Sequence, residues 1–260
     1  MRKMKIAKIA VPAILLCVLA CFLVFRVRYS EKELIIQSGD REIYGYLFRP
    51  RFAASGTPLV VLGHGYGGSY SDNLDYGRYF AEHGTACYVF DFCGGSEDSR
   101  STPVEMSLYT EMEDLNGIAD YMLQQPWLEE SGLVLAGKSL GGTVAALVAA
   151  ERPEDVGGLI LHYPYFILSE SLGGDGKTGI VDNVFDVISA FHGDVLIFNG
   201  DQDKYVPLEF TEKASEAYDH AELVVVEGSG HGFGGTDRLM VKQKMTDYIR
   251  KLQGGTGNDR

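Results

Sequence analysis

The stretch "SGLVLAGKSLGG", from Ser131 to Gly142, matches two catalytic patterns that give the same serine different roles. Read from Gly132, it is G-x-x-x-x-G-K-[ST], the phosphate-binding P-loop, in which Ser139 would bind magnesium. Read from Gly137, it is G-x-S-x-G, a strand–turn–helix signature in which Ser139 is a nucleophile. The surrounding residues decide between the two.

A P-loop needs a loop whose backbone N–H groups surround the phosphate, but here its four variable residues are the apolar run "LVLA". This run is typical of a buried strand, and "QQPWLEES" before it, with its proline and acids, is not expected to form the strand instead. A partner carboxylate, Asp91, would precede the loop, which is the less usual order. We therefore predict a strand from Gly132, a helix from Gly141, and Ser139 on the sharp turn between them.

The rest of the chain alternates between short apolar runs and segments with helical spacing. The turn signal at 38–40, between "ELIIQS" and "EIYGYLFRP", predicts an N-terminal antiparallel hairpin. Short apolar strands separated by helices indicate a mostly parallel α/β sheet with helices on both faces. The expected strands after the hairpin are 58–65, 86–95, 132–139, 157–164, 194–203 and 221–231, and the expected helices are 72–84, 107–125, 141–153, 207–218 and 236–252.

A serine nucleophile needs a base to take its proton and a carboxylate to orient the base. For a strand–turn–helix serine, the chain order is serine, acid, histidine. We predict His231 as the base, because the Gly-rich "GSGHGF" follows the last strand, whereas His162 falls within a strand. We predict Asp203 of "GDQDKYVP" as the acid and interpret Asp201 as a turn residue.

The negative charge that develops on the substrate needs two backbone donors. We predict the N–H groups of Leu140, directly after the nucleophile, and of Tyr66, in the loop after "VVLGHG". His64 in that loop is expected to be structural.

Five motifs together carry a family resemblance: "HGYGG", "DFCGGSEDS", "GKSLGG", "GDQDKYVP" and "GSGHGF". The chain resembles the α/β-hydrolase superfamily over residues 33–252, and within it the compact bacterial esterases similar to cinnamoyl and feruloyl esterases and the serine aminopeptidase-like S33 group. The resemblance implies the α/β-hydrolase fold, a triad of Ser139, Asp203 and His231, and oxyanion donors at Tyr66 and Leu140.

The sequence departs from these esterases in two places. Lys138 precedes the nucleophile where histidine is common, and we expect its side chain to be exposed or paired with an acid. The cap between the strands 157–164 and 194–203 is short, which argues against a phenolic ester as substrate. A short cap offers little apolar wall, so we expect small or short-chain acyl groups. Tyr165, Phe166 and Phe233 are candidate lining residues, and burial in the core is the equally weighted alternative for them.

The N-terminal residues 1–30 form a separate segment. Residues 9–25 are apolar and uncharged, with bases on both sides, and would span roughly 25 Å as a helix. The bases predict a cytoplasmic N-terminus and a body outside, with "RVRYSEKE" as a connector. A cleaved signal or a lipoprotein signal at Cys21 are alternatives. We assign 31–253 to one α/β-hydrolase domain and 254–260 to a flexible tail.

The body is acidic, because all 36 acids of the chain, whose net charge is −13, lie outside the basic residues 1–30. This charge argues against nucleic acid as a partner. Cys87 and Cys93 are expected to be packed thiols, and no Cys/His spacing predicts a metal site or a cofactor.

The leading hypothesis is a membrane-anchored serine carboxylesterase that acts outside the cytoplasm on a small-molecule ester. A serine peptidase or aminopeptidase on the same fold is an alternative, because the same triad cleaves amides. A non-catalytic binding module is a third hypothesis, against which the filled triad positions argue. The sequence does not indicate the natural substrate or the oligomeric state.

Overall fold

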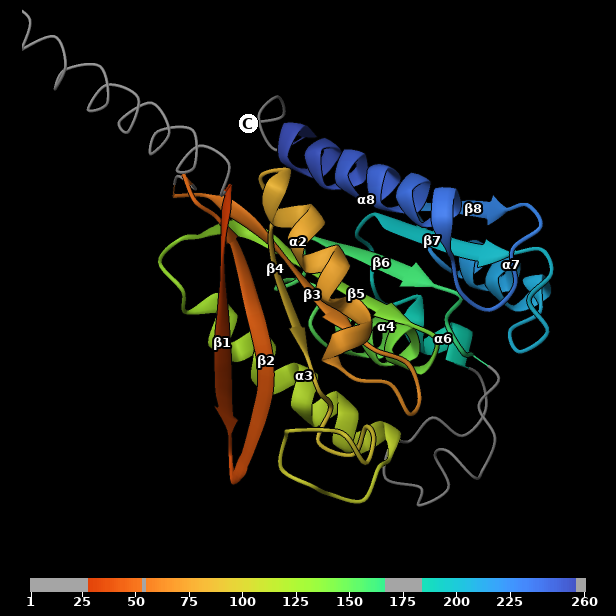
Figure 1. Ribbon diagram of the computed structural model, residues 1–260. Helices are drawn as coiled ribbons and strands as arrows, with labels where there is room; N and C mark the ends of the chain where they lie inside the picture. Colours follow the sequence, from red (N-terminus) through yellow and green to blue (C-terminus); the bar gives the residue numbers. More distant parts are fainter. Residues whose placement is uncertain (1–27, 53–54, 167–183, 256–260) are drawn as a thin grey trace, which may run out of the picture.

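The computed structural model describes residues 28–52, 55–166 and 184–255, which form one eight-stranded sheet surrounded by helices (Figure 1). The strand order across the sheet is β1-β2-β4-β3-β5-β6-β7-β8. The strands are β1 (Tyr29–Ser38), β2 (Arg41–Pro50), β3 (Thr57–Gly63), β4 (Ala86–Phe90), β5 (Leu128–Lys138), β6 (Gly158–His162), β7 (Val195–Gly200) and β8 (Ala221–Val226).

The sheet is antiparallel only at its N-terminal side. β1 pairs with β2, and β2 with β4, in antiparallel register. All the other neighbouring strands are parallel. The predicted hairpin and the mostly parallel α/β sheet are therefore confirmed.

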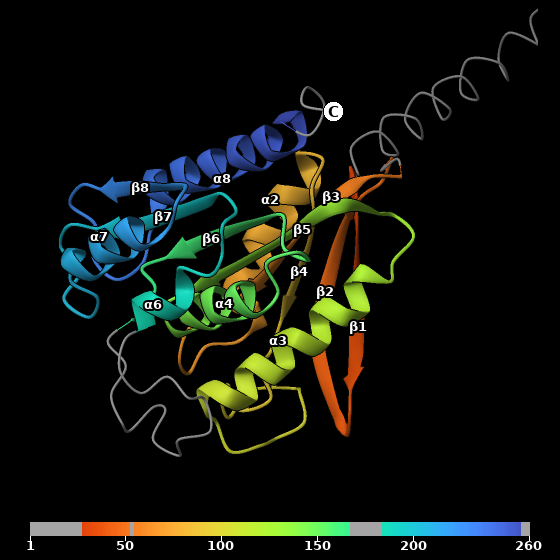
Figure 2. The same cartoon turned by 180° about the vertical axis from the view of Figure 1, so that it is seen from behind.

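Helices cover both faces of the sheet, as Figures 1 and 2 show from opposite sides. α2 and α8 pack on one face, while α3, α4, α6 and α7 contribute to the core on the other. The helices are η1 (Tyr70–Asn73), α2 (Leu74–Glu82), α3 (Leu108–Leu123), α4 (Leu140–Glu151), α6 (Val184–Ile188), α7 (Leu208–Ala217) and α8 (Gly235–Gly255).

The alternation of side chains along a buried strand produces two apolar cores. In β3, Leu59 and Val61 join the core beneath α3 and α4, whereas Val60 and Leu62 join the core beneath α2 and α8. All four side chains are fully buried. The continuous apolar run of β3 therefore identifies a central strand with helices on both faces.

Several element boundaries differ from the prediction; β4 ends at Phe90 and β8 at Val226, five residues before their predicted ends. β1 begins at Tyr29, so the segment interpreted as a connector is largely an edge strand, paired from Tyr29 opposite Pro50. β5 begins at Leu128 rather than Gly132, because Leu128 pairs with Thr57 before a register shift. α8 continues to Gly255, which leaves only 256–260 of the predicted tail outside the described residues.

The predicted membrane segment lies almost wholly in residues 1–27, outside the described residues, and its role stays a prediction. Within the described ranges, the longest helices are not apolar enough over 18 residues to qualify as membrane spans. Most of the predicted short cap, residues 167–183, also lies outside the described part; the short helix α6, which was not predicted, follows it.

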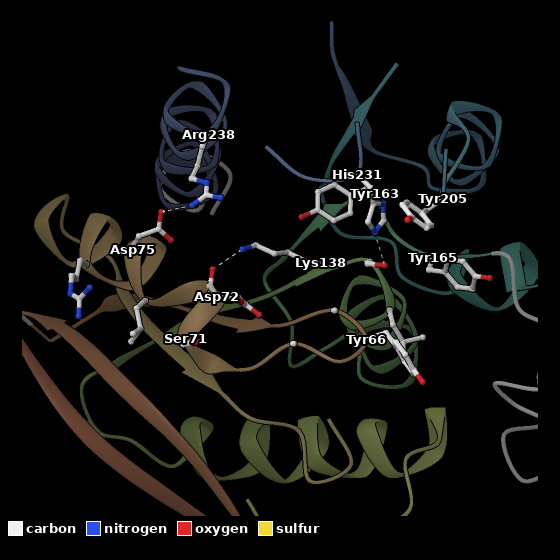
Figure 3. A pocket seen from close by; sticks show the side chains of 16 residues that line it. Tyr66, Ser71, Asp72, Asp75, Lys138, Tyr163, Tyr165, Tyr205, His231 and Arg238 are labelled. Carbon is white, nitrogen blue, oxygen red and sulfur yellow. Dashed lines mark hydrogen bonds and ion pairs between the residues drawn. The ribbon is translucent and has the colours of Figure 1, made fainter. Parts of the chain in front are cut away.

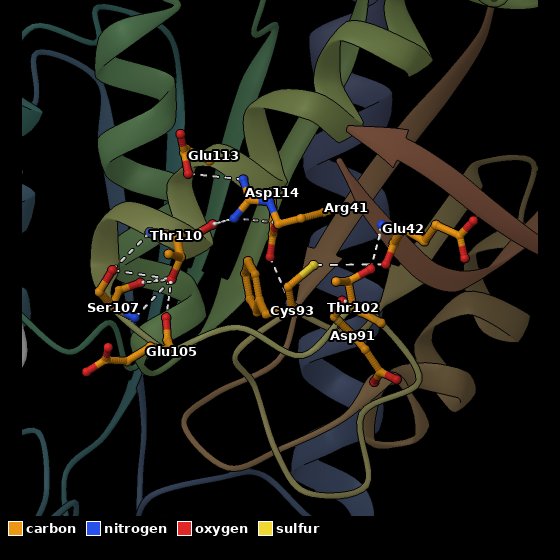
Figure 4. A network of polar contacts seen from close by, with 12 residues as sticks. Arg41, Glu42, Asp91, Cys93, Thr102, Glu105, Ser107, Thr110, Glu113 and Asp114 are labelled. Atoms are coloured by element: carbon orange, nitrogen blue, oxygen red, sulfur yellow. Dashed lines mark hydrogen bonds and ion pairs between the residues drawn. The ribbon is translucent and has the colours of Figure 1, made fainter. Parts of the chain in front are cut away.

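The hairpin is joined to α3 by a network around Arg41, shown in Figure 4. The Arg41 guanidinium donates to Glu113 at 3.1 Å and lies 3.4 Å from the Asp114 carboxylate. Asp114 also accepts a hydrogen bond from the backbone N–H of Cys93 at 2.8 Å. Burial raises the pKa of the Asp114 carboxyl, and Arg41 opposes that rise. Arg41 therefore supplies the charge that offsets the desolvation of Asp114.

Replacing this cation should destabilise the fold. We predict that Arg41→Met lowers the free energy of unfolding by about 3 kcal/mol, because the fully buried Asp114 side chain loses its counter-charge. Arg250→Met should lower it by less than about 1 kcal/mol, because Arg250 and its partner Asp247 are both exposed. Urea denaturation measures both, and equal losses would show that the Arg41 network contributes no more than a surface ion pair.

Candidate active site

Ser139 occupies the turn between β5 and α4 with a backbone φ of 52°. This left-handed region is costly for a residue other than glycine and persists only where neighbouring structure holds it. Hydrogen bonds on both sides of the residue hold it here. The Ser139 N–H donates to the His162 carbonyl at 2.9 Å, and its carbonyl accepts from Gly142 at 2.9 Å and from Tyr165 at 3.1 Å.

Glycines permit the close packing behind this turn. A Cβ at Gly137 would lie 2.1 Å from the Gly141 carbonyl oxygen, and a Cβ at Gly141 would lie 2.1 Å from that of His64. Both distances are far below van der Waals contact, so only glycine fits without a backbone shift. The two flanking glycines of the G-x-S-x-G motif therefore let β5, α4 and the loop after β3 meet beneath Ser139.

The structure brings the three predicted triad side chains together, although they come from three different loops. Figure 3 shows His231 from the side of the cavity. His231 Nε2 lies 3.1 Å from Ser139 Oγ. His231 Nδ1 lies 2.8 Å from Asp203 Oδ2. With the ring proton on Nδ1 donated to Asp203, Nε2 presents a lone pair to the serine hydroxyl, which is the arrangement that general-base catalysis requires.

The two aspartates after β7 differ in what they contact. The Asp203 side chain is fully buried, and its Oδ1 accepts the backbone N–H groups of Tyr205 and Val206, each at 2.9 Å. These bonds fix the carboxylate that faces His231. Asp201 instead accepts the N–H of Gly228 at 2.7 Å and connects the β7 loop to the β8 loop. This contact agrees with the interpretation of Asp201 as a turn residue.

The other histidines of interest have different surroundings. His64 Nε2 accepts the Phe92 N–H at 3.1 Å and its Nδ1 donates to the Gly65 carbonyl at 2.8 Å, while burial lowers its pKa. His64 is thus the structural residue that was predicted. His162 is fully buried in β6, where burial lowers its pKa well below the usual value. His192 pairs with Asp219 on the surface.

The two predicted oxyanion donors, Tyr66 and Leu140, both line the cavity that contains Ser139. Leu140 is the first residue of α4, where backbone N–H groups have no acceptor within the helix. The loop before Tyr66 packs closely against Ser139. A Cβ on Gly65 would lie only 3.2 Å from the Ser139 Cβ, so glycine permits this approach. The donor role of both amides stays a prediction.

The cavity has a volume of about 1010 Å³, and sequence reasoning missed several of its residues. Tyr163 and Tyr205 flank His231 with ring centroids 4.5 Å and 5.3 Å from the imidazole. The sequence offered a signal for each: Tyr163 directly follows β6, and Tyr205 lies two residues after Asp203, so both positions indicate a place near the carboxyl edge of the sheet. Tyr165 also lines the cavity, as expected. Phe166 and Phe233 do not line it; they are buried in the two apolar cores, which was the alternative for them.

Lys138 departs from the prediction that it is exposed or paired with an acid. Its side chain is half-buried, its Nζ donates to the backbone carbonyl of Asp72 at 3.0 Å, and it lies 4.4 Å from the centre of the Tyr76 ring. Burial lowers the pKa of Lys138 to about 8. The carboxylates of Asp75 and Asp72 partly oppose this effect.

No group of three or more metal-ligating side chains gathers anywhere in the described ranges. Cys87 and Cys93 are buried free thiols, as expected, and burial raises the pKa of both.

The parallel sheet with its antiparallel N-terminal strands, and the serine on a strained turn between β5 and α4, define an α/β-hydrolase. A family model described as serine aminopeptidase, S33, matches residues 55–178, and a second, described as TAP-like protein, matches residues 180–258. The chain therefore belongs to the α/β-hydrolase superfamily.

Individual relatives are distant. The chain is 27% identical to the quorum-quenching protein AidA of Acinetobacter baumannii over 119 residues, which is 45% of this chain and 39% of that protein. Among solved structures, Est1E from Butyrivibrio proteoclasticus with bound ferulic acid gives a TM-score of 0.76 at 20% identity, covering 85% of this chain and 99% of Est1E. A dienelactone hydrolase from Anabaena variabilis gives 0.70 at 19% identity, covering 86% and 98%. At these identities the structures show the fold alone.

The two aspartates of the β7 loop provide a test of the triad geometry. We predict that Asp203→Asn lowers kcat for p-nitrophenyl acetate by about 10³- to 10⁴-fold, because an amide at this position favours the wrong imidazole tautomer. Asp201→Asn should lower it by less than about tenfold, since that residue acts on loop structure and not on His231. Circular dichroism would verify that both variants fold. A larger loss at Asp201 would mean that the orienting carboxylate is misassigned.

Proposed function

We propose that the protein is a serine carboxylesterase that acts through an acyl-enzyme. The observation that carries the proposal is the continuous hydrogen-bonded series from Asp203 through His231 to Ser139, which opens onto the cavity. The membership in the α/β-hydrolase superfamily supports it. A non-catalytic binding module would not need these three side chains joined by hydrogen bonds.

In the proposed cycle, Ser139 Oγ attacks the ester carbonyl carbon while His231 Nε2 takes the hydroxyl proton. The resulting oxyanion accepts hydrogen bonds from the N–H groups of Leu140 and Tyr66. Collapse breaks the bond to the alcohol, which leaves with the proton from His231. A water molecule, deprotonated by His231, then attacks the acyl carbon; the bond to Ser139 Oγ breaks, His231 returns the proton to Oγ, and the acid is released.

Cleavage of an aminoacyl amide is a second candidate activity, favoured by the match to the serine aminopeptidase family model. The triad is the same for both reactions, so the two are distinguished by substrate. A panel that pairs p-nitrophenyl esters with aminoacyl p-nitroanilides measures the preference, and a higher kcat/KM for the anilides would replace the esterase assignment by a peptidase.

Removing the nucleophile should abolish turnover. We predict that Ser139→Ala lowers kcat for p-nitrophenyl acetate by at least about a thousandfold and prevents covalent labelling by a fluorophosphonate probe. Ser215→Ala, on the outer surface of α7, serves as the matched control and should label and turn over normally. Turnover that persists in a folded Ser139→Ala protein would contradict the proposal.

The cavity lining indicates short acyl groups. Among the lining residues of the described chain, only Leu74 and Leu140 are aliphatic, and the rest are glycine, tyrosine, polar or charged. The apolar part of such a lining comes from tyrosine rings and two separate leucines, so it offers a long alkyl chain no continuous aliphatic wall. We predict that kcat/KM for p-nitrophenyl esters is highest between C2 and C6 and falls for longer chains. A maximum at C12 or longer would be incompatible with this lining.

A further inference from the structure

The cavity extends beyond Ser139 into an arm with charged walls. Lys138 points into this arm from the end of β5, Asp72 and Asp75 face it from η1 and α2, and Arg238 faces it from α8 (Figure 3). We call these four residues the charged arm. The triad does not use any of them, so the proposed acyl-enzyme cycle does not explain why charged groups gather beside the nucleophile.

The two acids of the charged arm have partners within the protein. The Asp75 carboxylate accepts from Lys242 Nζ at 2.7 Å and from Arg238 Nη1 at 3.3 Å. The Asp72 carboxylate accepts the backbone N–H of Ser69 at 3.0 Å, as part of the capping box of η1. Both carboxylates therefore already receive hydrogen bonds, and that of Asp75 helps to position Arg238 and Lys242.

The two cations, by contrast, keep donor capacity. The Lys138 ammonium carries three N–H donors, and its contacts to the described residues are one hydrogen bond, to the Asp72 carbonyl, and the face of the Tyr76 ring. The Arg238 guanidinium uses Nε for the Phe233 carbonyl at 2.8 Å and Nη1 for Asp75. Its Nη2 group is left to donate into the cavity that both residues line.

The surroundings of Lys138 favour an anion beside its ammonium group. Burial lowers the pKa of Lys138 most, and the positive charges of Arg238 and Lys242 lower it further, while Asp75 and Asp72 raise it. A bound anion would return to the ammonium the solvation that burial removes. A cationic ligand at this place would be repelled by Lys138, Arg238 and Lys242.

We propose that the charged arm binds a carboxylate of the substrate through Lys138 and Arg238, so that the preferred substrates are esters carrying a carboxylate on the acyl or the alcohol portion. This inference rests on the proposed esterase function and adds a substrate class to it. Arginine and lysine donors at a partly desolvated position form charge-assisted hydrogen bonds, which are the stronger kind.

The experiment compares charged and neutral esters of matched size with the full-length protein. For a carboxylate on the acyl portion, 4-nitrophenyl hemiglutarate is compared with 4-nitrophenyl valerate. For a carboxylate on the alcohol portion, O-butyryl glycolate is compared with O-butyryl glycolamide. After subtraction of the uncatalysed rates, kcat/KM of the anionic ester should exceed that of its neutral partner by at least about tenfold in one of the two pairs, as a charge-assisted hydrogen bond allows. That pair identifies the portion of the substrate that carries the carboxylate.

Matched variants attribute the preference to the charged arm. Lys138→Met and Arg238→Gln should each lower the anionic-to-neutral ratio of kcat/KM by about tenfold. Lys244→Met and Arg250→Gln, at exposed positions of α8 outside the cavity, should leave the ratio unchanged. The ratio cancels a general loss of activity, and Arg238, which is partly exposed, provides a second variant if Lys138→Met does not fold.

Two kinds of failure are distinguishable. If the neutral esters are hydrolysed but the anionic ester is not preferred in either pair, or if neither substitution lowers the ratio, the proposed carboxylate-binding role of Lys138 and Arg238 is wrong and the esterase proposal stands. If no ester is hydrolysed and the fluorophosphonate probe does not label Ser139, the proposed function is wrong and the substrate class is overturned with it.

Discussion

The structure depends on one backbone constraint, the left-handed conformation of Ser139 at the junction of β5 and α4. It costs of the order of 1–3 kcal/mol for a residue with a Cβ, so the rest of the fold must hold it. Gly137 and Gly141 remove the side chains that would collide there, and β6 supplies the carbonyl that fixes the Ser139 amide. The strain places the hydroxyl above the carboxyl edge of the sheet, where the loops after β7 and β8 can reach it.

The charged and polar side chains around Ser139 meet there because the strands that carry them are parallel. Because β5, β7 and β8 all end at the same edge, the side chains of Ser139, Asp203 and His231 meet without a long loop. The buried Asp203 carboxylate is satisfied by two backbone amides and orients His231. The cavity also contains the cationic side chains of Lys138 and Arg238, whose N–H donors are only partly used in hydrogen bonds within the protein. The same edge thus combines the proposed reaction centre with the proposed carboxylate-binding position.

Much of this arrangement could be predicted from the sequence because its signals are local. Apolar runs and glycines marked the strands and the Ser139 turn, and the motifs "GDQDKYVP" and "GSGHGF" selected Asp203 and His231 among the residues that chain order allowed. Strand starts without an apolar run were missed: "YSEKE" belongs to an exposed edge strand, and Leu128 comes two residues after Pro126. The charged arm was also missed, since Asp75 and Arg238 lie 163 residues apart and meet only through the packing of α2 against α8. No local pattern encodes that contact.

The central claim is that Ser139 is a nucleophile placed before two backbone donors. A crystal structure of the protein after reaction with a small fluorophosphonate tests it most directly. The account predicts a bond from phosphorus to Ser139 Oγ, with the phosphonyl oxygen within about 3 Å of the backbone nitrogens of Leu140 and Tyr66. Phosphorus on another side chain, or an oxygen that contacts neither amide, would contradict it.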